Sequence, residues 1–456
     1  MSSLSRVLRP ALRGTRSLAT TVVAGRTVAR PAAATAGRCA ARLANPARSL
    51  STTPVRRSEP VDMTDIPPTP ISHLSETEAA MAETVSKFAT EVVLPRARDM
   101  DEAENMDPGL VQQLFEQGLM GIEIPEEYGG AGMNFTSAIV GIEELARADP
   151  SVSVLVDVHN TLCNTALLHY GSEAVKQKWL PRLATDTVAS FCLSEPGSGS
   201  DAFALATRAE AVPDADGGGY TINGGKMWIT NAHEAGLFIV FANLDPSQGH
   251  RGITAFLVEK STPGFSIAKK EKKLGIRASS TCVLSFDDVR IPRENLLGRH
   301  GHGYRYAISL LNEGRIGIAA QMTGLALGAF ENAARYVWND RRQFGRLVGE
   351  FQGVQHQMAQ SWTEIAAARA LVYNAARKKE AGQDFVSDAA MAKLYASQVA
   401  SRVSGLAIEW MGGMGFVREG LAEKYWRDSK IGAIYEGTSN IQLNTIAKLL
   451  QKEYTV

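Results

Sequence analysis

Cysteine is scarce in this sequence, and the patterns that usually mark a metal site are missing. Four cysteines, Cys39, Cys163, Cys192 and Cys282, are spread over 456 residues, and no two of them have C-x-x-C spacing. Eight histidines are equally scattered, without an H-E-x-x-H pattern. Dispersed thiols fit a reducing compartment and argue against a disulfide framework or a zinc ribbon. We therefore expect no metal centre.

Long apolar runs and the common nucleotide-binding motifs are missing as well. No stretch reaches the roughly 18 uninterrupted apolar residues of a membrane-spanning helix. No G-x-G-x-x-G follows a predicted strand and no G-x-x-x-x-G-K-[ST] occurs, so a Rossmann dinucleotide site and a P-loop have no support. The run Gly-Ser-Gly-Ser at 197–200 is not the G-x-S-x-G of serine hydrolases. With 45% hydrophobic and 21% charged residues, the composition is that of a globular protein.

Acidic residues are absent from the first 58 positions, although the formal net charge of the whole chain is zero. Residues 1–58 contain eleven arginines and no lysine. This is typical of a mitochondrial presequence, so we expect delivery to the mitochondrial matrix; a disordered basic tail is the alternative. A Pro-rich linker, 59–72, follows. Residues 59–456 carry 37 basic and 48 acidic side chains, a net charge of −11 that disfavours nucleic-acid binding.

The pattern of the chain changes twice after residue 72, which predicts three domains of an α+β protein. Residues 73–186 have helical periodicity and begin with a capping box at Ser75 and Glu78. Residues 187–300 contain short β-rich runs without crossover helices, which predicts an antiparallel β-barrel or sandwich. Residues 301–456 return to long helices typical of a bundle. The main expected helices are 108–119, 135–148, 151–170, 172–185, 303–340, 351–381, 386–411 and 438–451, and the expected strands are 188–193, 220–229, 237–243, 253–259, 265–270 and 282–289.

Five short segments combine glycine, hydroxyl and aromatic residues of the kind that a cofactor site uses. In the first, a predicted strand runs into a loop of small residues from Leu193 to Asp201. Glycine in such a loop lets a planar ring or a phosphate approach the main chain closely. Taken alone, a structural turn explains the loop equally well. The segments are 191–201, 226–231, 341–345 with 351–352, 409–416 and 434–442.

Taken together and in this order, these segments resemble the motifs of the acyl-CoA dehydrogenase family. The resemblance runs from about residue 70 to the C-terminus, and the segments 274–281 and 312–321 are similar to those of short-chain and branched-chain members. It implies a subunit of helical, β and helical domains, an FAD cofactor, an acyl-CoA substrate and a homotetramer. It also implies electron-transferring flavoprotein as the electron acceptor.

The resemblance implies Glu436 as the catalytic base. Desaturation removes the α-proton while a hydride leaves the β-carbon for the flavin, and a carboxylate with a raised pKa in an apolar site suits the proton abstraction. Without the motif, Glu436 would be an ordinary acidic residue at a helix N-terminus. One subgroup of the family carries its base at the position of Gly314, which cannot act as one, and Glu313 would point about 100° away on a helix. We therefore expect Glu436 alone to serve, which argues against an isovaleryl-CoA specialist.

The resemblance also implies two sets of binding residues. We expect the small-residue loop and Trp228 beside the flavin ring, Arg341 at the pyrophosphate and the Gly437 N–H at the thioester carbonyl. Arg341, Gln352 and the segment 409–413 could act on the flavin of a neighbouring subunit. The expected cofactor residues are Cys192, Leu193, Ser194, Ser200, Trp228, Ile229, Thr230, Arg341, Gln352, Glu409, Trp410, Met411, Gly412, Gly413, Thr438, Ser439 and Asn440. The expected substrate residues are Ser200, Tyr304, Asn312, Glu313, Gly314, Arg315 and Gly437.

Acyl specificity depends on the space that the protein leaves beside the base. Small residues such as Gly314 and Gly317 would leave room beside the base for an α-methyl branch, so we expect short and 2-methyl-branched thioesters in fatty-acid and isoleucine catabolism. One methylene contributes only about 1–3 kcal/mol of discrimination, so neighbouring substrates should overlap. A straight short-chain acyl-CoA dehydrogenase is the first alternative. An acyl-CoA oxidase, a non-catalytic scaffold for respiratory-chain assembly and a helical adaptor are the others, and the loop and Glu436 argue against the last two.

Overall fold

The structure is a computed structural model that describes residues 71–455, so the predicted presequence (1–58) and nearly all of the linker (59–72) lie outside it. The first helical part begins as predicted. Ser75 Oγ accepts the Glu78 N–H at 3.3 Å, and the Glu78 carboxylate accepts the Ser75 N–H at 2.9 Å. The α-helices of this part are α1 (Glu76–Phe88), α2 (Ala97–Ala103), α3 (Pro108–Glu116), α4 (Phe135–Ala148), α5 (Pro150–Asp157), α6 (Thr165–Tyr170) and α7 (Glu173–Thr185).

The helix expected over 151–170 is interrupted by a π-helical segment, η4 (Val158–Asn164), between α5 and α6. Side chains of this segment bind backbone groups that are distant in sequence. Asn160 donates to the Leu119 carbonyl at 2.9 Å, and His159 Nδ1 accepts the Ala189 N–H at 3.0 Å. These bonds tie η4 to the turn after α3 and to the start of the sheet. π-helical segments are frequent at functional sites.

The middle part forms one sheet with the strand order β6-β7-β3-β2-β4-β5-β8, and β1 pairs with β4 beside this path. All six expected strands are present, together with two short ones, β2 and β8. We expect an antiparallel barrel or sandwich from the sequence, but the sheet is mixed and does not close into a barrel, because β1 and β2 both pair with β4 in parallel. The strands are β1 (Ala189–Cys192), β2 (Arg208–Ala211), β3 (Tyr220–Thr230), β4 (Leu237–Asn243), β5 (Ile253–Glu259), β6 (Phe265–Lys270), β7 (Thr281–Ile291) and β8 (Leu296–Leu297).

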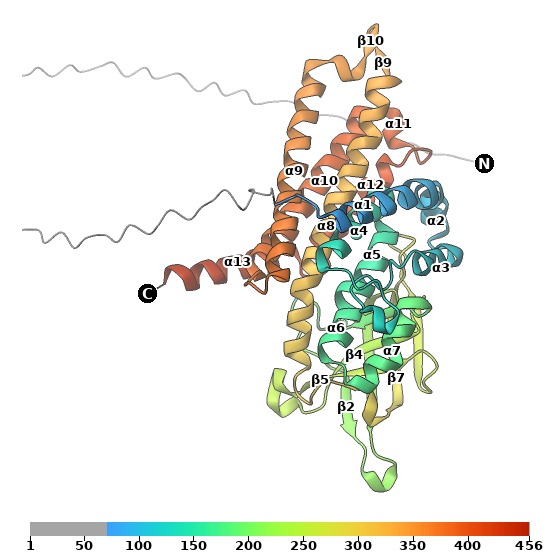
Figure 1. Cartoon of the computed structure of the whole chain (residues 1–456), viewed down its shortest axis with the longest axis vertical. Helices are drawn as coiled ribbons and strands as arrows, with labels where there is room; N and C mark the ends of the chain where they lie inside the picture. The colour runs from blue at the N-terminus through green and yellow to red at the C-terminus, as the bar shows by residue number, and fades with distance from the viewer. Residues whose placement is uncertain (1–70, 456) are drawn as a thin grey trace, which may run out of the picture. The chain divides into compact units, whose positions relative to one another are not determined.

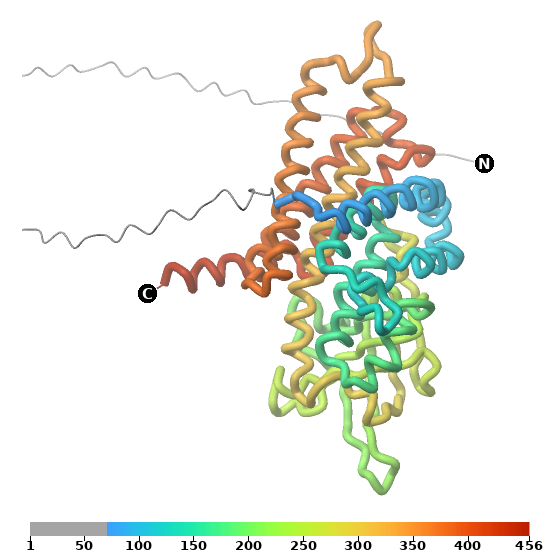
Figure 2. Tube along the Cα trace, viewed as in Figure 1, coloured from blue at the N-terminus to red at the C-terminus, as the bar shows by residue number. Residues whose placement is uncertain are grey.

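The C-terminal part is the predicted helical bundle. Figure 1 shows α8 (Gly303–Asn339), α9 (Gln352–Glu380) and α10 (Val386–Met411) side by side, with the small hairpin of β9 (Arg342–Gln343) and β10 (Arg346–Leu347) at one end. Two short helices, α11 (Gly413–Phe416) and α12 (Ala422–Ser429), lead through the turn η9 (Lys430–Ala433) into α13 (Ser439–Tyr454). The trace in Figure 2 follows α13 away from the three long helices, and its Leu443, Leu450 and Tyr454 side chains are exposed.

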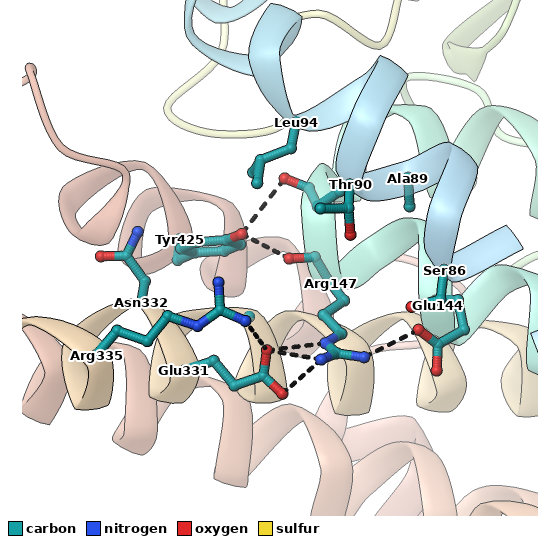
Figure 3. A pocket seen from close by; sticks show the side chains of 12 residues that line it. Ser86, Ala89, Thr90, Leu94, Glu144, Arg147, Glu331, Asn332, Arg335 and Tyr425 are labelled. Carbon is teal, nitrogen blue, oxygen red and sulfur yellow. Dashed lines mark hydrogen bonds and ion pairs between the residues drawn. The ribbon is translucent and has the colours of Figure 1, made fainter. Parts of the chain in front are cut away.

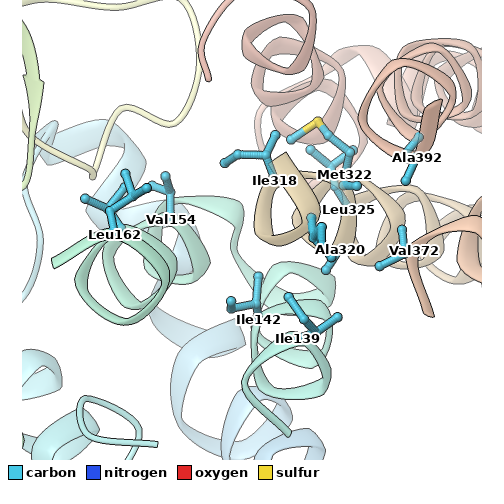
Figure 4. Close-up of a cluster of buried hydrophobic side chains, with 14 of the residues drawn as sticks. Ile139, Ile142, Val154, Leu162, Ile318, Ala320, Met322, Leu325, Val372 and Ala392 are labelled. Carbon is cyan, nitrogen blue, oxygen red and sulfur yellow. The ribbon is translucent and has the colours of Figure 1, made fainter. Parts of the chain in front are cut away.

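The largest core cluster surrounds α8 (Figure 4). Ile318, Met322 and Leu325 of α8 pack with Ile142 of α4 and Leu162 of η4 within it, and all of these side chains are buried. Fully burying one such side chain stabilises the fold by about 1.5–3 kcal/mol. Because α8 is buried on several faces, it fixes the positions of the polar residues that surround its first half. These residues come from the first helical part and from the bundle.

Candidate active site

Glu436 lies in the short connection between η9 and α13, and its backbone is unusual. Its φ of 50° is in the left-handed region, and the φ of Gly437 is 84°. A left-handed non-glycine residue costs of order 1–3 kcal/mol and persists only where its surroundings enforce it. The residue is partly exposed as a whole, but Oε2 of its carboxylate is buried and has no hydrogen-bond partner in the protein. Such an unpartnered buried acceptor is a candidate for chemistry.

The surroundings of the Glu436 carboxylate change its acidity. Burial raises its pKa to about 7, and the cations Lys393 and Arg315 act in the opposite direction. Asp157 of α5 and Cys163 of η4 also lie close enough for their own pKa values, both raised chiefly by burial, to feel the Glu436 charge. A carboxylate that titrates near neutral pH is suited to general-base catalysis at that pH.

Gly314 of α8 faces the carboxylate, as the sequence led us to expect. A Cβ at Gly314 would lie 3.2 Å from Glu436 Oε2 and 3.0 Å from Leu162 Cδ2. Gly317, one turn further on, has a different role: a Cβ there would collide with the Asp157 carboxylate. The expectation that Gly317 leaves open space for an α-methyl branch is therefore wrong, because its missing side chain accommodates Asp157.

The remaining α8 residues of the expected substrate set have different bonding partners. Arg315 donates to Asn312 Oδ1 at 2.8 Å, and its Nε is buried without a partner. Glu313, by contrast, binds Lys379 Nζ of α9 at 3.1 Å. Glu313 therefore belongs to an ion pair with Lys379, which disfavours it both as an alternative base and as a direct substrate contact.

The expected flavin loop is held against the end of β3 by a buried ion pair. Lys226 Nζ lies 2.7 Å from Glu195 Oε1 and donates to the Leu193 carbonyl at 3.0 Å. The Glu195 carboxylate also accepts the Ala206 N–H at 2.6 Å, and the Met227 N–H donates to the Ser194 carbonyl at 2.9 Å. These bonds bring Leu193 and Ser194 next to the β3 residues that follow Lys226.

Trp228 stands at an irregularity of β3, where the pairing with β7 shifts between Lys226 and Ile229. The backbone of Trp228 has a φ of 63°, and its side chain is 55% exposed. Bulges of this kind turn a side chain out of its regular position and are frequent beside active sites. Thr230 is half-buried, whereas the side chains of Ile229 and Cys192 are buried in the core of the sheet. Only the backbone of those last two residues can meet a cofactor.

The loop continues towards an aromatic cluster at the start of α8. Ser200 is exposed, and Phe203 lies beside Tyr304, with ring centroids 3.7 Å apart. His250 is next to Tyr304, with centroids 4.7 Å apart. Phe203 and His250 are not among the expected site residues, and their packing against Tyr304 is a finding of the structure.

The segment η4 connects the loop with Glu436. Cys163 of η4 is fully buried and lies close enough to both Cys192 and Glu436 for their charges to contribute to its raised pKa. η4 also contacts both β1 and α8. The structure thus brings the loop of β1, the end of β3, Gly314 and Glu436 together around one segment.

A second set of expected cofactor residues lies at the other end of the bundle. Arg341 Nη1 donates to the Trp410 carbonyl, and Gly412 has no room for a Cβ beside the guanidinium. Trp410 and Met411 are buried, whereas Gln352, Glu409 and Gly413 are exposed. With a rise of 1.5 Å per residue, α8 separates Gly314 from its C-terminal end near Arg341 by about 38 Å. One chain therefore does not bring this set to the base.

The N-terminus of α13 follows directly after Gly437 and so belongs with the residues around Glu436. Thr438 is the N-cap and accepts the Ile441 N–H at 3.3 Å, and Ser439 and Asn440 form the first turn. Free N–H groups of such a turn favour an anion.

A pocket where α1, α4, α8 and α12 meet is separate from this site (Figure 3). Arg147 pairs there with Glu331 at 2.7 Å and with Glu144 at 3.1 Å, and the Tyr425 hydroxyl donates to the Arg147 carbonyl at 2.6 Å. None of the expected site residues lines it. Because its charged groups are paired with each other, the pocket offers no free group for catalysis.

Comparison with known proteins decides the family. The models of the acyl-CoA dehydrogenase N-terminal, middle and C-terminal domains match residues 75–187, 190–289 and 301–451 in turn. The chain belongs to the acyl-CoA dehydrogenase family. Among its relatives, a probable short/branched chain specific acyl-CoA dehydrogenase of Dictyostelium discoideum is 55% identical, over 84% of this chain and 92% of that one. The mitochondrial short/branched chain specific acyl-CoA dehydrogenase of Rattus norvegicus is 52% identical, over 84% and 88%.

A solved structure agrees with the fold. The butyryl-CoA dehydrogenase of Megasphaera elsdenii superposes with a TM-score of 0.80 at 39% identity, over 83% of this chain and 99% of that one. The protein is accordingly an acyl-CoA dehydrogenase, a flavoprotein oxidoreductase that depends on FAD.

The residues of the site fit such a cofactor. The exposed Trp228 indole and the small-residue loop beside it offer a surface that a flat ring would cover. Glu436 Oε2 and Arg315 Nε are both buried without a hydrogen-bond partner in the protein, and a bound substrate would supply such partners. Over residues 71–455, no cluster of potential ligands could hold a metal ion, and no helix is long and apolar enough to cross a membrane.

Proposed function

We propose that this acyl-CoA dehydrogenase acts on short and 2-methyl-branched acyl-CoA thioesters, with Glu436 as the base that removes the α-proton. The observation that carries the proposal is the carboxylate oxygen Oε2 of Glu436, which is buried without a partner 3.2 Å from the place of a Cβ at Gly314. A proton acceptor in this position is desolvated and has a pKa near neutral pH. Glu313 is occupied by Lys379, so it does not compete for the role.

The chain's other residues would orient the reactants around that base. When bound, FAD supplies the acceptor for the hydride that leaves the β-carbon as the α-proton is removed. Ser194, Ser200, Trp228 and Thr230, with the backbone of Cys192, Leu193 and Ile229, would hold the ring and the neighbouring part of the cofactor. The Gly437 N–H would polarise the thioester carbonyl, because a donor aimed at the developing enolate oxygen stabilises it most in the transition state. Tyr304, Asn312 and Arg315 would line the binding site of the acyl-CoA.

The second set, Arg341, Gln352 and 409–413, would serve the flavin of another subunit. This follows from its distance of about 38 Å from the base along α8. We propose a homotetramer on this ground, and the exposed Leu443, Leu450 and Tyr454 of α13 support contacts between copies. Thr438, Ser439 and Asn440 would bind an anionic part of the cofactor at the start of that helix.

The substrate class rests on the relatives. Those named short/branched chain specific are 52–55% identical to this chain, whereas the butyryl-CoA dehydrogenase is 39% identical. The higher identity to the short/branched chain specific relatives favours 2-methylbutyryl-CoA, with butyryl- and isobutyryl-CoA as further substrates. A straight short-chain enzyme remains the alternative. The arginine-rich residues 1–58 and the mitochondrial rat relative support a place in the matrix, in fatty-acid and isoleucine catabolism, with electron-transferring flavoprotein as acceptor. We propose domains at 73–186, 187–300 and 301–456.

The experiment is anaerobic addition of 2-methylbutyryl-, butyryl-, isovaleryl- and octanoyl-CoA, each separately, to the purified flavoprotein. We expect bleaching of the flavin absorbance, fastest with the 2-methyl-branched thioester and lost in Glu436→Gln. A preference for octanoyl-CoA would overturn the substrate class. Hydrogen peroxide released in air at the rate of turnover would favour an oxidase, and a protein without bound flavin and without bleaching would favour the scaffold.

A further inference from the structure

Two fully buried side chains from different helices converge on the carbonyls of Glu436 and Gly437. Lys393 of α10 donates from Nζ to the Gly437 carbonyl at 2.6 Å. Gln442 of α13 donates from Nε2 to the same carbonyl at 2.8 Å and to the Glu436 carbonyl at 3.2 Å. Both side chains are completely buried. Neither belongs to the expected site, and neither touches a group that the reaction changes.

These bonds explain how the left-handed conformation of Glu436 is maintained. Two consecutive residues with positive φ place both carbonyls outside any helix or strand, so neither carbonyl has a donor from regular secondary structure. Lys393 and Gln442 satisfy both of them. A Cβ on Gly437 would lie 2.7 Å from Gln442 Nε2, so only glycine permits this close approach.

The Lys393 side chain has a second effect through its charge. Burial lowers the pKa of Lys393 to about 7, while the nearby Glu436 charge acts in the opposite direction, so Lys393 and Glu436 titrate in the same pH range and Lys393 acts as a cation while it holds its proton. It has no anionic partner at hydrogen-bond distance in the described residues, which is rare for a fully buried lysine. Glu436 is faced by this cation from α10, by Arg315 from α8, by Asp157 from α5 and by Cys163 from η4, with Tyr435 adjacent in sequence. Among these groups, Lys393 and Arg315 favour the ionised carboxylate.

We propose that Lys393 and Gln442 are positioning residues that lock the Glu436–Gly437 backbone, and that the Lys393 charge also sets the pH at which the base becomes active. The inference rests on the proposed function of Glu436. Lys393→Met removes the bond and the charge, whereas Gln442→Leu removes two bonds and leaves the charge. Ser404→Ala is the control, because Ser404 is buried in the same helix and bonds only to carbonyls of α10 itself.

The measurement is the rate of flavin bleaching by butyryl-CoA between pH 5.5 and 9, in holoenzyme, with thermal unfolding of each variant recorded in parallel. We expect Lys393→Met to lower the maximal bleaching rate at least tenfold, with the half-saturating butyryl-CoA concentration changed less than threefold. The midpoint of the pH profile should move upwards, because the lost cation no longer favours the ionised carboxylate. Gln442→Leu should lower the maximal rate without moving the midpoint. Ser404→Ala should change neither.

A Lys393→Met enzyme with a lower melting temperature but an unchanged midpoint and maximal rate would overturn the proposal, since a purely structural lysine would behave in that way. Should Lys393→Met fail to fold, a Gln442→Leu enzyme with the wild-type maximal rate would overturn it. Activity that survives in Glu436→Gln would instead refute the proposed base, so the two failures can be told apart.

Discussion

At the residue scale, the features of Glu436 that suit it to act as a base also lower the stability of the fold. Its backbone is left-handed, and one carboxylate oxygen is buried without a partner. Motif resemblance singled out this residue from the sequence. It could not show that the Asp157 carboxylate fills the space beside Gly317 or that Glu313 pairs with Lys379, because these contacts depend on how α5 and α9 pack around α8.

Replacing Glu436 with glutamine should therefore stabilise the protein while it abolishes activity. Burial raises the pKa of Glu436 from 4.5 to about 7, so the folded state holds the proton more tightly than the unfolded chain does. The contribution of the wild-type carboxyl to stability is full below pH 4.5 and is lost as the pH rises through about 7. The advantage of Glu436→Gln should grow over that window to about 1–3 kcal/mol. Urea unfolding at pH 5 and pH 8 measures it, and an advantage that is absent or shrinks towards pH 8 would refute the raised pKa.

At the scale of the elements, local sequence patterns predicted most helices and strands, and long-range bonds explain the exceptions. The capping box at Ser75, the long bundle helices and the six main strands follow from sequence neighbours. The π segment η4 does not, because its side chains bind carbonyls and N–H groups about 30 to 40 residues away. The parallel pairing of β1 depends in the same way on β4, because the paired residues Ala189 and Leu237 are 48 positions apart in the sequence.

The loop after β1 depends on one such long-range contact, the buried pair of Lys226 and Glu195. Lys226→Met would leave the Glu195 carboxylate buried without its cation, which costs about 3–5 kcal/mol. We expect a lower melting temperature and loss of flavin during gel filtration. Lys178→Met is the matched control, since its pair with Glu259 is largely exposed and should contribute less than about 1 kcal/mol. Equal flavin content and equal melting temperatures in both variants would contradict this role of the pair.

At the scale of the whole molecule, α8 separates two groups of site residues by about 38 Å. The order of the motifs along the sequence placed all of these residues in one family pattern. It could not show that the two groups lie far apart within a single chain. The separation predicts that complete sites form between copies of the chain.

Mixing two inactive variants tests this arrangement. Arg341→Ala chains keep Glu436, and Glu436→Gln chains keep Arg341, so a mixed oligomer contains some sites with both residues intact. Co-expression of the two should restore about a quarter to a half of the activity per flavin, whereas each variant alone stays inactive. Activity that does not rise above the sum of the separate variants would contradict sites shared between subunits.

The most direct test of the account is the pH dependence of anaerobic flavin bleaching by 2-methylbutyryl-CoA, in the wild-type protein and in Glu436→Gln. A base with a pKa raised to about 7 must lose its proton before it can act, so the wild-type rate should rise with pH through about 7 and then level off. Glu436→Gln should be slower by roughly 10²–10⁴-fold at every pH. A Glu436→Gln enzyme that bleaches at the wild-type rate, or a wild-type rate that does not change between pH 5.5 and 8.5, would contradict the central claim.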